Sequence, residues 1–110
     1  MKTIDKETLR HWLGTPKLYL IDVRSPKAFD QSIAKIEQAH RIDPATLPKL
    51  APDLPKDRKL VLYCEDGKTE CPNVARQLRK LGFKEVFVLK GGWQTWYGKE
   101  YPAVPKELDY

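Results

Sequence analysis

Three apolar runs in the chain each have the length of one buried β-strand. They occupy residues 17–24, 59–63 and 85–89 and are rich in Leu, Val and Ile. Nearly continuous apolar runs of this kind are typical of parallel strands that are covered on both faces of their sheet. Two weaker segments, residues 3–4 and 36–42, predict further short strands.

Helical patterns alternate with these runs. They are expected over residues 6–13, 26–31, 74–81 and 93–97. Asp5 and Ser25 have the side chains and positions of N-caps for the first two helices. The proline-rich segment 43–54 predicts irregular structure with one helical turn. Strands that alternate with helices predict an α/β fold, with a mostly parallel central sheet flanked by helices on both faces.

The composition is that of one globular domain over residues 1–110. Hydrophobic residues make up 41% and charged residues 32%, and no apolar stretch has membrane-spanning length. The net charge of +5 is spread along the chain beside acids, so we expect no nucleic-acid or membrane partner, and a monomer. The N-terminus lacks a signal-peptide pattern, which predicts a cytoplasmic protein. A periplasmic protein whose leader had been removed would look the same.

The loop after the second strong strand carries the most informative chemistry. Cys64 ends the strand 59–63, and a Gly67-containing loop then leads into a helix. Backbone N–H groups of such a loop and the positive end of the helix both favour a thiolate, the reactive form of cysteine. Cys64 is therefore the candidate nucleophile, and an inert buried cysteine is the alternative. A Cys64 sealed from solvent, with the loop amides turned elsewhere, would contradict the nucleophile hypothesis.

The loop is acidic. Its three carboxylates (Glu65, Asp66 and Glu70) face one cation, Lys68, and would raise the pKa of Cys64 if they approached it. We expect them to point outward into solvent. Lys68 is the best candidate to contact an anionic donor, with a solvent-facing lysine as the alternative.

The second cysteine and a threonine flank the loop's end. Thr69 has a hydroxyl that is able to donate to a bound sulfur or to a loop carbonyl. Cys71 is expected to be a small residue packed at the helix start; the alternative is a thiol that resolves an oxidised Cys64. Two cysteines and two histidines that are far apart in sequence predict no metal site.

Asp22 and Arg24 end the first strong strand, at the sheet edge where α/β folds place their sites. We expect a structural ion pair, with Arg24 also within reach of a donor. Trp93, in the last helix, is expected to support the mouth of the pocket or to pack in the core.

Three blocks of this sequence together resemble rhodanese-like domains. They are Leu20-Ile21-Asp22-Val23-Arg24, Val61-Leu62-Tyr63-Cys64, and the closing segment 82–93 with its Gly91-Gly92-Trp93. Their order and spacing cover nearly the whole chain. The loop also fits the Cys-x-x-Gly-x-Thr form of thiosulfate and mercaptopyruvate sulfurtransferases.

The resemblance implies that Cys64 carries a sulfane sulfur as a persulfide and that the loop surrounds it with backbone amides. The substrate-binding residues implied are Glu65, Asp66, Gly67, Lys68, Thr69, Glu70 and Arg24. The expected donors are thiosulfate, a low-molecular-weight persulfide or a persulfidated protein, with no cofactor. The acidic loop argues against a high-affinity site for dianionic thiosulfate.

Two other functions remain open at this point. Related folds whose loop is one residue longer act as phosphatases or arsenate reductases, and the spacing here is one residue longer than the commonest form. Those enzymes need an arginine to grip the oxyanion, whereas Glu70 stands in its place. A non-catalytic binding or regulatory module is the other alternative, which the presence of Cys64 disfavours.

Overall fold

A five-stranded parallel sheet forms the centre of the molecule in the computed structural model, which describes residues 2–109. In spatial order its strands are β1 (Lys2–Ile4), β6 (Val86–Leu89), β5 (Lys59–Tyr63), β2 (Leu18–Asp22) and β4 (His40–Arg41). Each neighbouring pair is parallel. The three strong apolar runs thus become the three inner strands, as predicted.

Strand β5 lies in the middle of the sheet and is buried on both faces. Leu60, Val61 and Leu62 expose none of their surface, although their side chains alternate between the faces. On one face the core includes Leu47, Leu78 and Phe83, and on the other it includes Leu9 and Trp96. The register pairs Asp22 at the end of β2 with Tyr63 at the end of β5. Their polar groups therefore meet at the carboxyl edge of the sheet.

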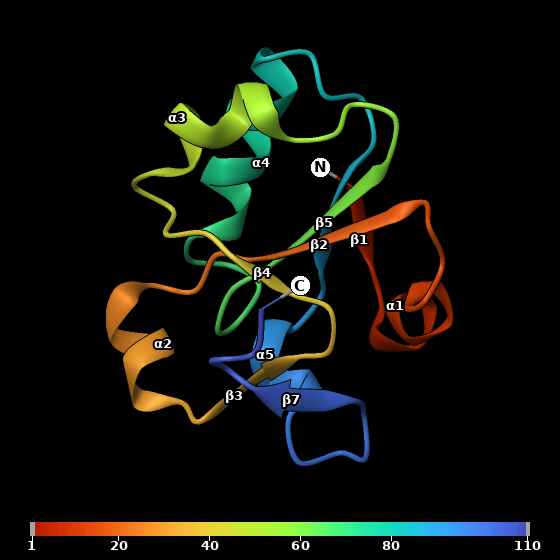
Figure 1. The fold of residues 1–110 in the computed structure, drawn as a ribbon, viewed down its shortest axis with the longest axis vertical. Coiled ribbons are helices and arrows are strands. Elements are labelled where there is room, and N and C mark those ends of the chain that lie inside the picture. The colour runs from red at the N-terminus through yellow and green to blue at the C-terminus, as the bar shows by residue number, and fades with distance from the viewer. Residues whose placement is uncertain (1, 110) are drawn as a thin grey trace.

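Helices cover both faces, which confirms the predicted fold class. The helices are α1 (Lys6–Trp12), α2 (Pro26–Gln31), α3 (Leu47–Leu50), α4 (Cys71–Lys80) and α5 (Gly92–Trp96), with a 3₁₀ turn at Ala51–Asp53. Figure 1 shows α3 and α4 on one side of the sheet and α1 and α5 on the other. The predicted N-caps are confirmed, since Asp5 accepts from the amide of Thr8 at 2.8 Å and Ser25 from that of Ala28 at 3.1 Å.

The segment 36–42 holds the predicted short strand at its end, as β4, and it also contains the last residue of another strand. Its beginning belongs to β3 (Ala34–Ile36), which pairs antiparallel with β7 (Ala103–Pro105) in a separate two-stranded sheet. Its end belongs to β4, and the chain reverses between them through Gln38, whose φ is 72°. The predicted helix 74–81 also begins earlier, at Cys71, so that its first turn adjoins the cysteine loop.

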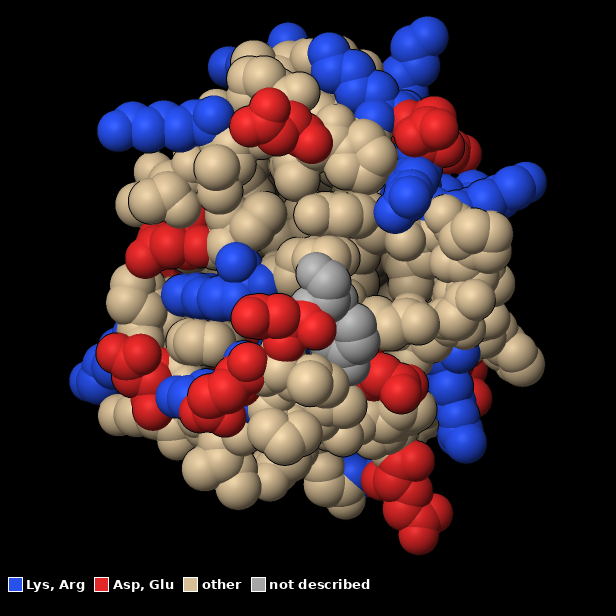
Figure 2. Space-filling view, in the orientation of Figure 1, with Lys and Arg blue, Asp and Glu red and all other residues tan. Residues whose placement is uncertain are grey.

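The surface carries both signs of charge. Lys and Arg are interspersed with Asp and Glu across the face seen in Figure 2. Among residues 2–109 no helix has the length and apolar character needed to cross a membrane.

Candidate active site

The cysteine loop, residues 64–70, connects the end of β5 to the start of α4 and rests directly on the start of α5. The amide of Trp93 donates to the carbonyl oxygen of Cys64 at 2.8 Å, and that of Gln94 donates to the carbonyl oxygen of Glu65 at 3.0 Å. At Gly92 a Cβ atom would lie 2.3 Å from the carbonyl oxygen of Cys64. The loop therefore reaches this position only because residue 92 has no side chain.

Position 67 requires glycine for two reasons, its positive φ and the lack of space for a side chain. Its φ is +77°, in the region that favours glycine, and an added Cβ would lie 2.9 Å from the carbonyl oxygen of Leu89. Close packing of the loop against the end of β6 thus holds the loop backbone in place.

Hydrogen-bond donors surround the sulfur of Cys64. They are the thiol of Cys71 and the backbone amides of Cys71, Glu70 and Gly67. These bonds, the thiol of Cys71 first among them, lower the pKa of Cys64 to about 6, against the opposing effect of burial. A pKa of about 6 corresponds to a sulfur that is mainly thiolate at neutral pH, and the role of Cys64 as the nucleophile stays a prediction.

Cys71 does more than pack at the helix start. The same hydrogen bond and its burial raise the pKa of the Cys71 thiol well above its usual range, so Cys71 stays protonated and donates to the thiolate. Both cysteines are free thiols. Cys71 is packed and fully buried at the start of α4, as expected, and its side chain also hydrogen-bonds the sulfur of Cys64.

Cys64 exposes 0% of its surface. One half of the condition that would contradict a nucleophile is thus met, since the residue is sealed from solvent. The other half is not met, because the loop amides face the sulfur. Lys68 and Thr69, on the outer part of the loop, are exposed.

The carboxylate of Asp66 is partly exposed to solvent, as expected for the loop acids, but it also folds back onto the loop. Its Oδ1 lies 3.8 Å from the Sγ of Cys64 and accepts from the amides of Lys68 at 2.8 Å and Thr69 at 3.0 Å. The hydroxyl of Thr69 donates to Asp66 Oδ2 at 2.9 Å, not to a loop carbonyl or towards the sulfur. These bonds lower the pKa of Asp66, whereas burial raises the pKa of the neighbouring Glu70.

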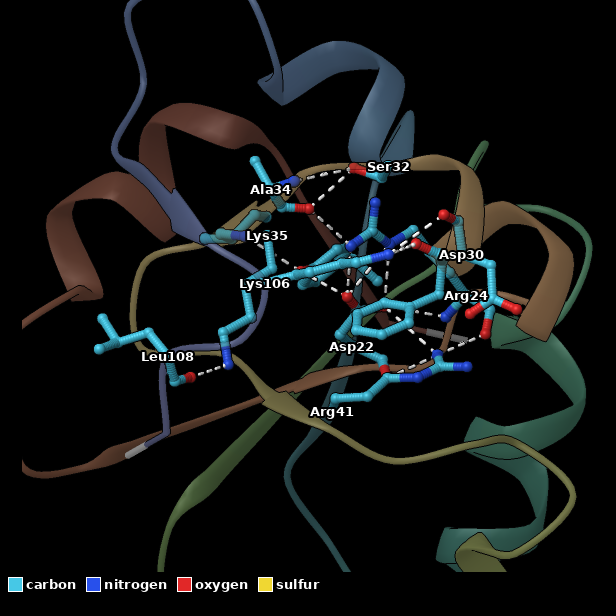
Figure 3. Close-up of polar contacts among 12 residues, drawn as sticks. Asp22, Arg24, Asp30, Ser32, Ala34, Lys35, Arg41, Lys106 and Leu108 are labelled. Carbon is cyan, nitrogen blue, oxygen red and sulfur yellow. Dashed lines mark hydrogen bonds and ion pairs between the residues drawn. The ribbon is translucent and has the colours of Figure 1, made fainter.

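The carboxylate of Asp22 is the centre of a buried polar cluster behind the loop (Figure 3). Its Oδ2 accepts from Arg24 NH2 at 2.7 Å and from the hydroxyl of Tyr63 at 2.9 Å. Arg24 also donates to the carbonyl oxygen of Ala34 at 3.0 Å. Asp22 and Arg24 expose none of their surface, so they form the expected structural ion pair.

Arg24 is as fully buried as Cys64. Its guanidinium carbon lies 4.5 Å from the centroid of the Trp93 ring, under the site and away from solvent. Asp22 accepts from Nε and NH2 of the Arg24 guanidinium, whereas the buried NH1 has no hydrogen-bond partner among the described residues, so contact of Arg24 with a substrate stays a prediction. Trp93 has the expected supporting role, because its ring contacts Arg24 and stacks on Tyr97 at 4.8 Å.

A surface groove of about 460 Å³ adjoins the loop. It is lined by Ala28, Gln31, Ser32, Ile33, Glu65, Trp93 and Tyr97. Ile33 and Tyr97 are among the exposed large hydrophobic residues of the molecule. Glu65 of the cysteine loop and Trp93 of α5 therefore both line this groove, so a molecule bound in the groove would contact the loop.

Sequence reasoning missed the roles of Cys71, Gly92 and Tyr63. The spacing of Cys71 from Cys64 signals only that both flank one loop, and the contact of the two sulfurs depends on where α4 begins. The pair Gly91-Gly92 indicated a turn in the sequence, but it did not indicate that the cysteine loop packs against Gly92. Within residues 2–109 no group of three or more His, Cys, Asp or Glu side chains is placed to hold a metal ion.

The chain is similar to known proteins over nearly all of its length. The family model for the rhodanese-like domain matches residues 5–99. An uncharacterized protein, YqhL, from Bacillus subtilis is 35% identical over 99 residues, which cover 90% of this chain and 75% of that protein. A sulfurtransferase from Allochromatium vinosum is 31% identical over 105 residues, which cover 94% of this chain and 95% of that protein.

A solved structure shares the fold. The crystal structure of a rhodanese-related protein from Thermoplasma volcanium superposes with a TM-score of 0.79 at 23% identity, covering 94% of this chain and 98% of that one. At this identity the likeness concerns the fold alone.

Proposed function

The chain belongs to the rhodanese-like domain family, and from this we propose that it is a sulfurtransferase that carries a sulfane sulfur on Cys64. The observation that carries the proposal is the environment of one sulfur atom. Three backbone amides and the thiol of Cys71 donate to Cys64 and lower its pKa to about 6. A relative of similar length is named a sulfurtransferase, which supports the same conclusion.

The proposed reaction has two halves. In the first, the thiolate of Cys64 attacks the outer sulfur of the donor, and the donor's sulfur–sulfur bond breaks. The leaving group departs with the electron pair, as a thiolate from a persulfide or as sulfite from thiosulfate. Cys64 then holds one additional sulfur as a persulfide. In the second half, a nucleophilic acceptor attacks that outer sulfur, and the Cys64 thiolate leaves.

The low pKa of Cys64 serves both halves of the reaction. It supplies the attacking thiolate at neutral pH, and it makes Cys64 a good leaving group when the acceptor takes the sulfur. The ring of amides that stabilises the thiolate also offers donors to the anionic persulfide. The amide of Trp93 holds the carbonyl oxygen of Cys64, and Asp22 accepts from the hydroxyl of Tyr63, the residue before Cys64.

The test is a transfer assay with a matched variant. With an alkyl persulfide as donor and cyanide as acceptor, the wild-type chain is expected to form thiocyanate catalytically, and Cys64→Ser is expected to form none above background. Equal rates for the two proteins would contradict the proposal. Absence of transfer from both persulfide and thiosulfate would instead identify the chain as a non-catalytic binding module.

A further inference from the structure

The carboxylate of Asp66 occupies hydrogen-bond donors at the outer end of the cysteine loop. Its oxygens accept from the amides of Lys68 and Thr69 at 2.8 and 3.0 Å, and from the hydroxyl of Thr69 at 2.9 Å. An anion of a substrate would otherwise find those three donors free. The loop thus already contains an anion, supplied by its own chain.

This internal anion lies beside the reacting atom. Asp66 Oδ1 accepts a long hydrogen bond of 3.8 Å from the Sγ of Cys64 when that thiol is protonated, so the carboxylate lies beside the atom that receives the sulfur. The donors that remain directed at the sulfur are the amides of Gly67, Glu70 and Cys71 and the thiol of Cys71. They hold the sulfur of Cys64 itself, and they leave the outer end of the loop to Asp66.

Thiosulfate and organic persulfides differ in the charge that they bring to this end of the loop. In thiosulfate the transferred sulfur is bound to a sulfonate group that leaves as a dianion. In an organic persulfide the transferred sulfur is bound to a thiol sulfur that leaves with a single charge. Repulsion by a nearby carboxylate rises with the charge of the approaching group. Asp66 therefore penalises thiosulfate more than a persulfide.

We propose that Asp66 is a specificity-determining residue that disfavours dianionic thiosulfate and directs the loop towards organic persulfides. The inference rests on the proposed sulfurtransferase function and adds its donor class. The reaction in question is attack of the Cys64 thiolate on the outer sulfur of R–S–SH, with release of the thiolate R–S⁻. No bond to Asp66 forms or breaks, and its effect on the rate is electrostatic.

The test compares two donors in two variants. Asp66→Asn keeps a carbonyl oxygen able to accept from the amides of Lys68 and Thr69, and it removes the charge. We expect its kcat/KM for thiosulfate to rise at least about tenfold while kcat/KM for an alkyl persulfide changes less than about threefold. Asp5→Asn is the matched control, since Asp5 also accepts a backbone amide, from Thr8, and caps α1. It should leave the ratio of the two kcat/KM values unchanged.

Two further variants separate charge from folding. Asp66→Glu keeps the charge and is expected to keep the preference for the persulfide. If Asp66→Asn does not fold, as judged by thermal denaturation, Asp66→Ser gives the same comparison with a smaller acceptor. An unchanged donor ratio in the neutral variants, or an equal rise in Asp5→Asn, would overturn the inference.

The outcome also distinguishes this inference from the proposed function. If wild-type Cys64 gains sulfur from the persulfide but neutral variants at position 66 show the wild-type donor ratio, only the role of Asp66 falls. If Cys64 gains no sulfur from either donor in any variant, the sulfurtransferase function falls, and the role of Asp66 falls with it.

Discussion

Replacing Cys71 with alanine is expected to raise the pKa of the nucleophile. The thiol of Cys71 is the largest of the contributions that lower the pKa of Cys64 to about 6. A hydrogen bond to a charged group contributes about 1.5–3 kcal/mol, and 1.36 kcal/mol corresponds to one pKa unit. Loss of this donor is therefore expected to move the pKa of Cys64 to about 7–8 in Cys71→Ala.

The assay is the rate of alkylation by iodoacetamide as a function of pH. At pH 6.5 the thiolate fraction should fall from about three quarters to between about a quarter and about 3%, so alkylation of Cys71→Ala should be roughly 3- to 25-fold slower. At pH 9 the variant should react at least as fast as wild type, because a more basic thiolate is the stronger nucleophile. Cys71→Ser keeps a hydroxyl donor and is expected to titrate closer to wild type. A pKa of about 6 in Cys71→Ala would refute the role assigned to the thiol.

Three other predictions concern the fold and the loop. Arg24→Ala removes the closer of the two ion-pair partners of the buried Asp22 carboxylate and leaves it only Arg41, at 3.6 Å, so it should lower the free energy of unfolding in urea by about 3 kcal/mol. Lys59→Ala, which removes an exposed ion pair, should cost under about 1 kcal/mol, and equal losses would contradict this reasoning. Gly92→Ala should abolish sulfur transfer by displacing the loop, while Gly98→Ala, also at positive φ but in open space, should retain it. Folding lowers the pKa of Cys64, so the folded state releases a proton and the free energy of unfolding should rise between about pH 6 and 9. The rise should be about 2–4 kcal/mol larger in wild type than in Cys64→Ala. Parallel curves of the free energy of unfolding against pH for the two proteins would exclude this.

Local sequence patterns predicted the fold correctly wherever one strand coincides with one apolar run. Strand β5 is an example, because its burial on both faces demands the continuous apolar residues that the sequence displays. The pairing of β3 with β7 was not predictable in this way. Each strand has three residues, and they lie far apart in the sequence, so the pairing depends on tertiary contacts that no local pattern records.

The sequence predicted where in the fold the candidate site lies, but it did not predict the side-chain contacts within the site. That Cys64 ends a strand and precedes a helix is visible in the sequence, and so is the need for Gly67 in the loop. The contact of Asp66 with the loop was not, because its side chain follows the direction of two loop amides. The burial of Arg24 was missed for a similar reason: Asp22 and Trp93 enclose it only once β2 and α5 are packed.

The most direct test of the central claim is the intact mass of the protein after exposure to a persulfide donor. Wild type is expected to gain the mass of one sulfur atom, to lose it on addition of cyanide, and to return to its starting mass. Cys64→Ala is expected to gain nothing, while Cys71→Ala should still gain one sulfur. Sulfur retained by Cys64→Ala, or a wild-type protein whose mass never changes with any donor, would contradict the account.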